Sequence, residues 1–359
     1  SGGAPIETPW ISCCKSLIHG YLGGQAGAGA MADLLTGNAV PCGKLAESWP
    51  MTLEDTPCAH YYPGREKTAE YREGIYVGYR YYDTVGKQVR FPFGFGLSYT
   101  SFEYADLDVS DTEATFRITN TGDVPGAEIA QLYISIEEPK VFRPIRELKG
   151  FAKAFLQPGE SKTVSILLDD KAFRYFNSAT NRWEREAGSY RIEVGASSRD
   201  VRLVKVIEGT NAPIPYMPGT LPSYASGRID AVEEEEFSRL LGYPLPDRRW
   251  DRTAPLTVND TFVQLQYAPS WIGRQIFRLF QHQVDSANSK GKPDLDALFR
   301  LSMPFRGIAK MTGGIADMAM TEAVVEIFNG HFFRGCGSFL KAWRRKGREA
   351  KAFRKRGDA

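Results

Sequence analysis

The sequence lacks any apolar run that approaches the length of a bilayer, so it predicts no membrane-spanning segment. It also lacks a strong net charge. The formal charge is +2 at neutral pH, so no overall field favours nucleic acid, and we expect no nucleic-acid partner. Glycine-rich phosphate motifs of the GxGxxG and GxxxxGK[ST] types are absent as well.

Cysteine and histidine are sparse and scattered. The five cysteines are an odd number without metal-ligand pair spacing, which argues against a disulfide framework and favours a reducing, cytoplasmic compartment. The four histidines are too far apart in sequence to indicate a metal site, so we expect neither a metal nor a cofactor. These residues are Cys13, Cys14, Cys42, Cys58 and Cys336, and His19, His60, His282 and His331.

What the chain does contain is ordinary globular composition over 359 residues, with 42% hydrophobic and 25% charged residues. This length suffices for two or three domains with their own cores. The high glycine and proline counts, 35 and 21, favour many turns and β-structure.

The N-terminal region, residues 1–100, has the pattern of an α/β unit. An apolar strand is predicted at 17–22, followed by the glycine turn 23–27 and a small-residue helix at 28–35, with Gly37 as a left-handed cap. A phosphate cradle at these glycines is the alternative, but close packing of the helix on a sheet is the better interpretation. Residues 41–50 read as a turn into a short strand, and residues 51–73 as a surface loop.

The stretch 74–104 joins two differently built regions. Residues 75–82 are β-branched and aromatic and predict a strand, and residues 83–86 predict a turn. Residues 91–100 combine glycines and a proline with three phenylalanines, which predicts a tight, buried crossover between two domains.

From residue 101 to 208 the apolar residues alternate with polar ones. Runs near 114–119, 130–136, 163–168 and 190–194 have a period of two and are separated by turn signals. Short alternating strands over about a hundred residues predict an antiparallel β-sandwich of immunoglobulin-like type.

The last part of the chain has helical character. Residues 209–228 include Pro213, Pro215, Pro218 and Pro222 and predict a linker. In the extension 229–359, helices are predicted at 230–241 with Asp230 as N-cap, at 271–284, and at 308–329 with Gly330 as the stop. We expect the apolar faces of these helices to pack on the rest of the protein or on a second subunit, forming a homo-oligomer.

The C-terminal run 341–356 holds nine Lys and Arg residues and one Glu, with Trp343 and Phe353 interspersed. Such a run could hold anionic lipid or nucleic acid. A solvated helix end is the simpler interpretation, since charge runs are usually solvated faces.

Several motifs, in order and spacing, resemble family-3 glycoside hydrolases of the β-glucosidase type. The first group resembles that family's α/β-sandwich domain, and the second resembles its fibronectin-type-III-like domain. The first group is Gly24-Gln25, 41–45, 74–83 and 93–102, and the second is 119–122, 147–151, 156–160 and 195–200. The fold class is therefore a partial α/β sandwich, then an immunoglobulin- or fibronectin-III-like β-sandwich, then an α-helical tail.

The resemblance implies a retaining glycosidase that uses a nucleophilic Asp and an acid/base Glu. In the family the Asp lies on an N-terminal (β/α)8 barrel and the Glu lies upstream of the strand that would end at Ser1-Gly2-Gly3. Neither motif is present, so we assign no catalytic residue, and we expect the chain to be the inactive C-terminal part that requires a barrel domain. Ala26 stands where the family commonly has Glu, which puts a contact there in doubt.

Residues in and near the surface loop are the candidates for a site. The carboxylates Glu54, Asp55, Glu66, Glu70 and Glu73 have no spacing that predicts a catalytic pair and read as solvated charges. The tyrosines could stack on sugar rings, but packing at the domain interface is favoured, and Glu7 and Trp10 suit a cleft rim or a structural role equally. The tyrosines are Tyr61, Tyr62, Tyr71, Tyr76, Tyr79, Tyr81 and Tyr82.

The function expected for the intact protein is hydrolysis of terminal β-linked sugars from oligosaccharides or glycosides, with carbohydrate as the substrate. The alternative is a non-catalytic module that binds polysaccharide, a membrane surface or a protein partner. The strand edge that a half-domain would expose argues against this alternative. The sequence leaves the sugar open among glucosides, xylosides and glucosaminides.

Overall fold

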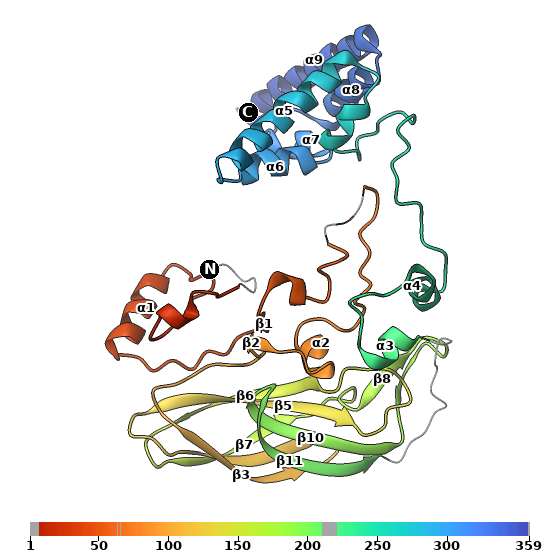
Figure 1. Cartoon of the computed structure of the whole chain (residues 1–359). Helices are drawn as coiled ribbons and strands as arrows, with labels where there is room; N and C mark the ends of the chain where they lie inside the picture. Colours follow the sequence, from red (N-terminus) through yellow and green to blue (C-terminus); the bar gives the residue numbers. More distant parts are fainter. Residues whose placement is uncertain (1–6, 63, 65, 210–220, 358–359) are drawn as a thin grey trace. The chain divides into compact units, whose positions relative to one another are not determined.

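The computed structural model describes residues 7–62, 64, 66–209 and 221–357, which fall into two compact units (Figure 1). The first unit ends at Arg248 and the second begins at Arg249. The first unit contains the β-sandwich and the segments packed on it, and the second unit is helical. We describe each unit by itself.

Irregular chain and short elements precede the sandwich in the first unit. They are η1 (Ile11–Cys13), α1 (Gly27–Thr36), β1 (Trp49–Pro50), η2 (Leu53–Asp55), α2 (Tyr79–Thr84) and β2 (Val89–Phe91). Strands β1 and β2 pair antiparallel, which confirms the short strand predicted before residue 51. The left-handed cap at Gly37, with φ +79°, also matches its prediction.

The sandwich consists of a four-stranded sheet in the order β11-β10-β5-β6 and a three-stranded sheet in the order β3-β4-β7. All pairings in these two sheets are antiparallel, and the small hairpin β8–β9 accompanies them. The strands are β3 (Phe102–Val109), β4 (Glu113–Asn120), β5 (Gly126–Ile136), β6 (Glu147–Leu156), β7 (Ser161–Leu167), β8 (Arg174–Asn177), β9 (Arg182–Arg185), β10 (Gly188–Ser197) and β11 (Asp200–Gly209).

The core of the sandwich lies between the two sheets. Phe116 and Ile118 of β4 face Leu132 of β5 and Ile192 of β10, and all four side chains are buried. The residues that alternate with these on β4 are the half-buried Thr115 and the exposed Arg117. The period-two pattern therefore predicted these strands correctly, because one face of each sheet must leave water.

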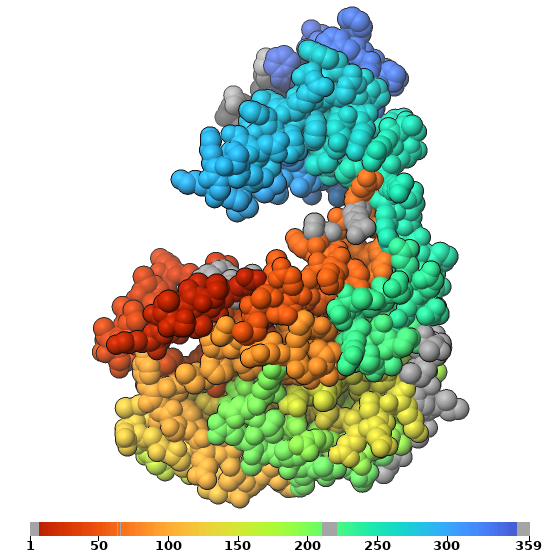
Figure 2. All heavy atoms as spheres, in the orientation of Figure 1, coloured from red at the N-terminus to blue at the C-terminus, as the bar shows by residue number. Residues whose placement is uncertain are grey.

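The segment that precedes β1 differs from its prediction. Residues 17–22 form no strand, and Tyr21 has φ +48°, which interrupts an extended chain. Helix α1 forms as predicted, but none of its residues is buried among the described residues, so the expected packing on a sheet is not seen. Figure 2 shows this segment, in red, at the surface of the unit.

The aromatic block 75–82 is also not a strand. Residues 72–75 form a turn, Gly78 adopts φ +55°, and helix α2 begins at Tyr79. Tyr79, Tyr81 and Tyr82 are buried on this helix. Strand propensity mainly reports how well a side chain packs on a half-buried surface. Here the packed side chains are carried by a helix instead of a strand.

Residues 221–241 pack within the first unit and do not form a free linker. Helix α3 (Pro222–Ser226) and helix α4 (Glu234–Leu241) follow the sandwich. Leu221, Tyr224, Ile229 and Phe237 share one buried cluster with Tyr76. This differs from the linker expected over 209–228 and from a helical extension that begins at 229. Pro213, Pro215 and Pro218 lie outside the described residues.

The N-cap predicted at Asp230 is also wrong, because α4 begins four residues later, after Glu233. Three glutamates, Glu234, Glu235 and Glu236, occupy its first turn, where the helix dipole stabilises negative charge.

The second unit is a helical assembly with its own core. Phe262, Leu265, Phe305, Val325 and Phe328 are its buried centre. Its elements are η3 (Phe262–Tyr267), α5 (Trp271–Ser289), α6 (Leu295–Ser302), α7 (Gly307–Met311), α8 (Met318–Phe328) and α9 (Phe332–Gly357). Among the described residues, no helix is both long and apolar enough to cross a bilayer.

The single helix predicted over 308–329 is divided into α7 and α8. Gly313 and Gly314 adopt positive φ between them. The Asp317 side chain then accepts a hydrogen bond from the Met320 amide at 2.9 Å, which caps α8. Gly330, with φ +93°, follows the end of α8 as predicted.

The docking of residues 221–241 yields a prediction at Tyr224. This side chain is 0% exposed, and its hydroxyl donates to the Arg72 carbonyl at 2.8 Å. The Tyr224→Ala substitution should lower the free energy of unfolding by about 3–5 kcal/mol, because it leaves a cavity and an unpaired carbonyl. Thermal unfolding and limited proteolysis within 221–241 would measure this loss.

Tyr243→Ala is the matched control, because Tyr243 is 58% exposed. We expect it to change the free energy of unfolding by less than about 0.5 kcal/mol. Equal effects of the two substitutions would show that residues 221–241 do not pack on this unit.

Candidate functional site

A polar cavity of about 250 Å³ lies between the loop at 60–72 and the residues before α4. The cavity brings together three of the candidates named from sequence, His60, Tyr61 and Glu70. Its walls also include Arg72 and Arg248. The site is therefore rich in charge, and its chemistry depends on whether those charges are already paired.

Glu70 is the best-placed carboxylate of this cavity, and it is fully engaged. It forms an ion pair with Arg72 at 2.7 Å and another with Arg248. Burial raises the pKa of Glu70, but the hydrogen bonds and charges of the two arginines outweigh it and hold the pKa below its usual value. A general acid of a glycosidase needs a raised pKa, so Glu70 has the wrong shift for that role.

The other candidate carboxylates also lack the properties of a catalytic pair. Asp55 pairs with Lys87 at 3.1 Å and caps η2 through Thr52. Burial raises its pKa, but the bonds from Lys87 and Thr52 outweigh burial and lower it. Glu54 and Glu66 are exposed, and Glu73 is buried beside the Tyr76 cluster. These positions fit structural or solvated roles.

The tyrosines divide into a buried group and an exposed group. Tyr76, Tyr79, Tyr81 and Tyr82 are buried in packing contacts, which agrees with the interface role favoured from sequence. Burial raises the pKa of Tyr76 to about 12, so its hydroxyl remains a donor. Tyr61 is half-buried and lies in the cavity, with the Arg72 guanidinium over its ring. The exposed tyrosines are Tyr62 and Tyr71.

The remaining candidates are separated in the structure. Glu7 accepts a hydrogen bond from the Leu53 amide, and Trp10 is exposed. His19 contacts the rings of Tyr21 and Trp49. His282 and His331 belong to the second unit, and within the described ranges no group of three His, Cys, Asp or Glu side chains could hold a metal ion.

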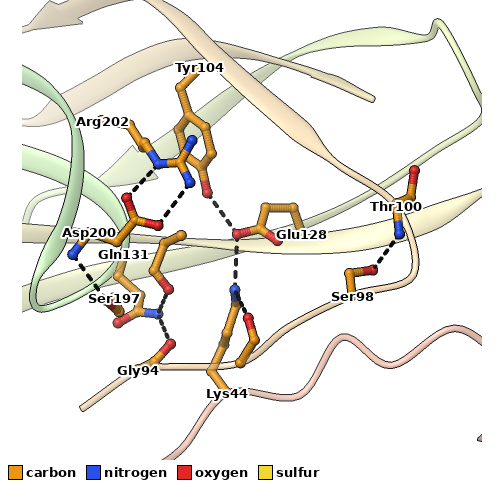
Figure 3. A network of polar contacts seen from close by, with 12 residues as sticks. Lys44, Gly94, Ser98, Thr100, Tyr104, Glu128, Gln131, Ser197, Asp200 and Arg202 are labelled. Carbon is orange, nitrogen blue, oxygen red and sulfur yellow. Dashed lines mark hydrogen bonds and ion pairs between the residues drawn. The ribbon is translucent and has the colours of Figure 1, made fainter. Parts of the chain in front are cut away.

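A second polar cluster joins the chain before residue 100 to the sandwich (Figure 3). Lys44 forms an ion pair with Glu128 of β5 at 3.1 Å, and the Tyr104 hydroxyl of β3 donates to the same carboxylate oxygen at 2.9 Å. The Lys44 and Glu128 side chains are only 10% and 7% exposed. Burial and the Glu128 charge raise the pKa of Tyr104, so it stays protonated as a donor.

Gln131, also on β5, fixes the crossover at Gly94. Its Nε2 atom donates to the carbonyls of Gly94 at 3.0 Å and Ala196 at 2.9 Å, and its Oε1 atom accepts from Tyr133 at 2.6 Å. A Cβ atom on Gly94 would lie 1.9 Å from Gln131 Oε1, and Gly94 has φ +77°. Only glycine can hold this position.

The junction brings together motifs that are far apart in the sequence. The segments 43–45, 93–96 and 195–198 meet here through backbone hydrogen bonds such as Gly94 N to Leu45 O and Ser198 N to Phe93 O. The predicted crossover is thereby located, but of residues 91–100 only Gly94 is buried, and Leu97 and Tyr99 are exposed. Sequence reasoning missed Glu128 as a member of the junction, although a carboxylate in the mainly apolar run 126–136 is a usable signal.

Comparison with known protein families agrees with this architecture. Residues 1–99 match the glycosyl hydrolase family 3 C-terminal domain, and residues 128–198 match the fibronectin type III-like domain. The chain carries the C-terminal domains of a family-3 glycoside hydrolase. The resemblance seen in the motifs and the fold class predicted from them are both confirmed.

Curated relatives that are similar to this chain carry the names of enzymes of two specificities. Thermostable beta-glucosidase B of Acetivibrio thermocellus is 49% identical over 209 residues, which are 56% of this chain and 28% of the relative. An exo-alpha-(1->6)-L-arabinopyranosidase of Bifidobacterium longum is 47% identical over 206 residues, 56% of this chain and 27% of the relative. The chain thus spans about a quarter of the length of these relatives.

Solved structures give the same match. The beta-glucosidase of Kluyveromyces marxianus in complex with glucose is 43% identical, with a TM-score of 0.56 over 58% of this chain and 26% of that one. The GH3 beta-glucosidase of Bifidobacterium adolescentis is 40% identical, with a TM-score of 0.56 over 64% and 36%.

The junction predicts a large effect of removing one charge. In Lys44→Met, Glu128 is left buried without its cation, and the free energy of unfolding should fall by about 3–5 kcal/mol. Adding Glu128→Gln should recover part of this loss, because the amide removes the unpaired charge but still accepts from Tyr104. Urea unfolding of the two single variants and the double variant would measure the coupling.

Arg117 and Asp106 form the comparison pair, at 2.7 Å with side chains 45% and 68% exposed. Arg117→Met should cost less than about 1 kcal/mol. A cost in Lys44→Met no larger than this would contradict the view that the junction is a desolvated ion pair.

Glu70 predicts a specific pH dependence. Its pKa is lowered in the folded state from an ordinary 4.5, so its ionised form contributes stability above the unfolded pKa. That contribution is lost as pH falls through the folded pKa. Glu70→Gln should therefore be less stable than wild type at neutral pH, and the difference should shrink below about pH 4.5.

Urea unfolding from neutral pH to about pH 3 would follow this difference. Glu54→Gln, which removes an exposed carboxylate, is the control and should follow the wild-type curve. A stability difference for Glu70→Gln that grows on acidification would reverse the sign and refute the assignment.

Proposed function

We propose that this chain supplies the C-terminal domains of a retaining, β-glucosidase-like glycoside hydrolase that removes terminal β-linked sugars. The proposal is supported by the matches to both C-terminal domains of the family and by relatives that are 46–49% identical and are named as glycosidases. The two catalytic carboxylates of the family would come from a (β/α)8 barrel portion and from the upstream part of the α/β domain.

One observation carries the requirement for that further portion. Helix α1 has no buried residue. Leu35 on the helix is 72% exposed, and Leu22, which precedes the helix, is 82% exposed. Burying a leucine contributes about 1.5–3 kcal/mol, so a helix with both leucines in water lacks the packing that normally stabilises it. We infer that the rest of the α/β domain and the barrel cover this surface.

The substrate is proposed at the level of a terminal sugar. A relative named as an arabinopyranosidase is almost as similar to this chain as one named as a beta-glucosidase. The matched domains therefore do not distinguish the two sugars, and specificity would be set by residues that this chain does not contain.

We also propose a reducing, cytoplasmic location. Cys13, Cys14, Cys42, Cys58 and Cys336 are all free thiols in the structure. Cys13 and Cys14 are exposed as well as unpaired, which suits a compartment that keeps thiols reduced.

Complementation tests the proposed function. The purified chain should not hydrolyse nitrophenyl β-glucoside or nitrophenyl α-L-arabinopyranoside. Mixed with the separately expressed barrel and upstream α/β portion of the Acetivibrio thermocellus relative, which should also be inactive alone, it should hydrolyse one of them. The choice of sugar should follow the barrel portion.

The interface is tested by a pair of substitutions. Leu35→Glu should reduce the reconstituted activity at least about tenfold, because it places a charge in an interface that must be desolvated. Leu167→Glu, at a position of β7 that is 76% exposed, should leave the activity unchanged. Turnover by this chain alone would overturn the requirement for a barrel, and equal effects of the two substitutions would refute the α1 interface.

A further inference from the structure

The two units carry opposite charge, which the near-neutral total conceals. Residues 249–359 hold 19 Lys and Arg against 10 Asp and Glu, whereas residues 1–248 hold 26 against 33. The positive charge is concentrated in α9, whose sequence contains ten Lys and Arg and one Glu. Such a concentration points to an anionic surface as the partner of this helix.

One side of α9 packs on α8. Gly335 and Ala342 are buried, and a Cβ on Gly335 would lie 2.5 Å from Ile327 Cγ1 of α8. Residues 335, 339, 342 and 346 recur at helical spacing and define this side. The opposite side of α9 is left to the solvent.

A stripe of exposed apolar side chains runs beside the packed side. Phe333, Leu340 and Trp343 are 88%, 46% and 60% exposed. Their spacing of seven and three residues places them on one face of the helix. Phe332 at the start of α9 is 45% exposed and adds a third aromatic ring beside Phe333 and Trp343. Among the described residues, these four side chains keep between 45% and 88% of their surface exposed.

The cations of α9 fall into a paired group and an unpaired group. Arg334 pairs with Glu326 and Arg345 pairs with Asp317, both of which belong to or cap α8. Lys341, Arg344 and Arg348 form no ion pair within the part of the chain that is described. At spacings of three and four residues they make a second exposed stripe, next to the apolar one.

We propose that α9 binds the surface of an anionic lipid bilayer and lies in its plane. Phe333, Leu340 and Trp343 enter the boundary between headgroups and acyl chains, and Lys341, Arg344 and Arg348 contact the anionic headgroups. A helix with an apolar stripe flanked by unpaired cations fits this site. Duplex nucleic acid would use the cations but leave the apolar stripe in water, and a second copy would bring two positive surfaces together.

Vesicle flotation of the full chain tests this proposal. The protein should float with vesicles in which about a third of the lipid is phosphatidylglycerol and should not float with pure phosphatidylcholine vesicles. Added salt should weaken the binding, because it screens the charges. Equal binding to both vesicles, or binding to neither, would overturn the proposal.

Three sets of substitutions identify the surface. Lys341→Glu, Arg344→Glu and Arg348→Glu together should lower the vesicle partition coefficient at least about tenfold. Leu340→Ser with Trp343→Ser should lower it several-fold without changing the charge. Lys290→Glu, Lys292→Glu and Arg300→Glu change the charge by the same amount at exposed positions outside α9 and should have little effect.

Far-ultraviolet circular dichroism and thermal unfolding should be unchanged in all three sets, since every substituted side chain is exposed. Equal losses in the α9 and control sets would refute the assignment to α9. Two other results would also overturn the proposal. One is binding of duplex DNA or RNA by a protein that does not float with vesicles. The other is a doubled mass in light scattering that the α9 substitutions abolish, again without flotation.

Discussion

Glu128 places a carboxylate inside a β-sandwich, and the union of the first two domains depends on how that charge is satisfied. Lys44 reaches it from the preceding domain, and Tyr104 donates to it from β3. Because a buried unpaired charge is strongly unfavourable, the segment that carries Lys44 cannot leave the sandwich without exposing or orphaning Glu128. Gly94 allows the crossover to approach closely enough for Gln131 to hold it. The boundary near residue 100 is therefore held by a buried ion pair and by side-chain hydrogen bonds to the crossover.

How far the fold could be predicted follows from what each pattern measures. Period-two alternation reports burial on one face of a sheet, and it located the strands of the sandwich because those strands are buried in that way. The aromatic block 75–82 gave the wrong element because its rings are buried on a short helix against residues 221–237, which are distant in sequence. Period alone also could not show that Gly313 and Gly314 divide α7 from α8.

The candidate site was predictable as a set of motifs but not as a set of contacts. The motifs at 41–45, 93–102 and 195–200 were recognisable, and the structure shows that they meet at one junction. The partners of these motifs, Glu128 and Gln131, lie in strand β5. The alternating pattern predicted this strand only as part of the sandwich core. The pairing of Glu70 with Arg248 joins residues far apart in sequence, and no local pattern records it.

Exposed apolar side chains occur on several of the described helices, and on α1 and α9 the charge beside them distinguishes the partner. Helix α1 contains no Lys or Arg and one Asp, so its exposed Leu35 lies on a nearly neutral, small-residue surface. Such a surface suits close packing against another protein layer, as in an α/β domain.

Helix α9 exposes rings beside three unpaired cations, and a protein core would have to desolvate those charges. A bilayer surface imposes no such penalty, since the cations remain among hydrated, anionic headgroups while the rings leave water. The same physical quantity, apolar area in water, therefore points to a protein partner at one end of the chain and to a lipid surface at the other.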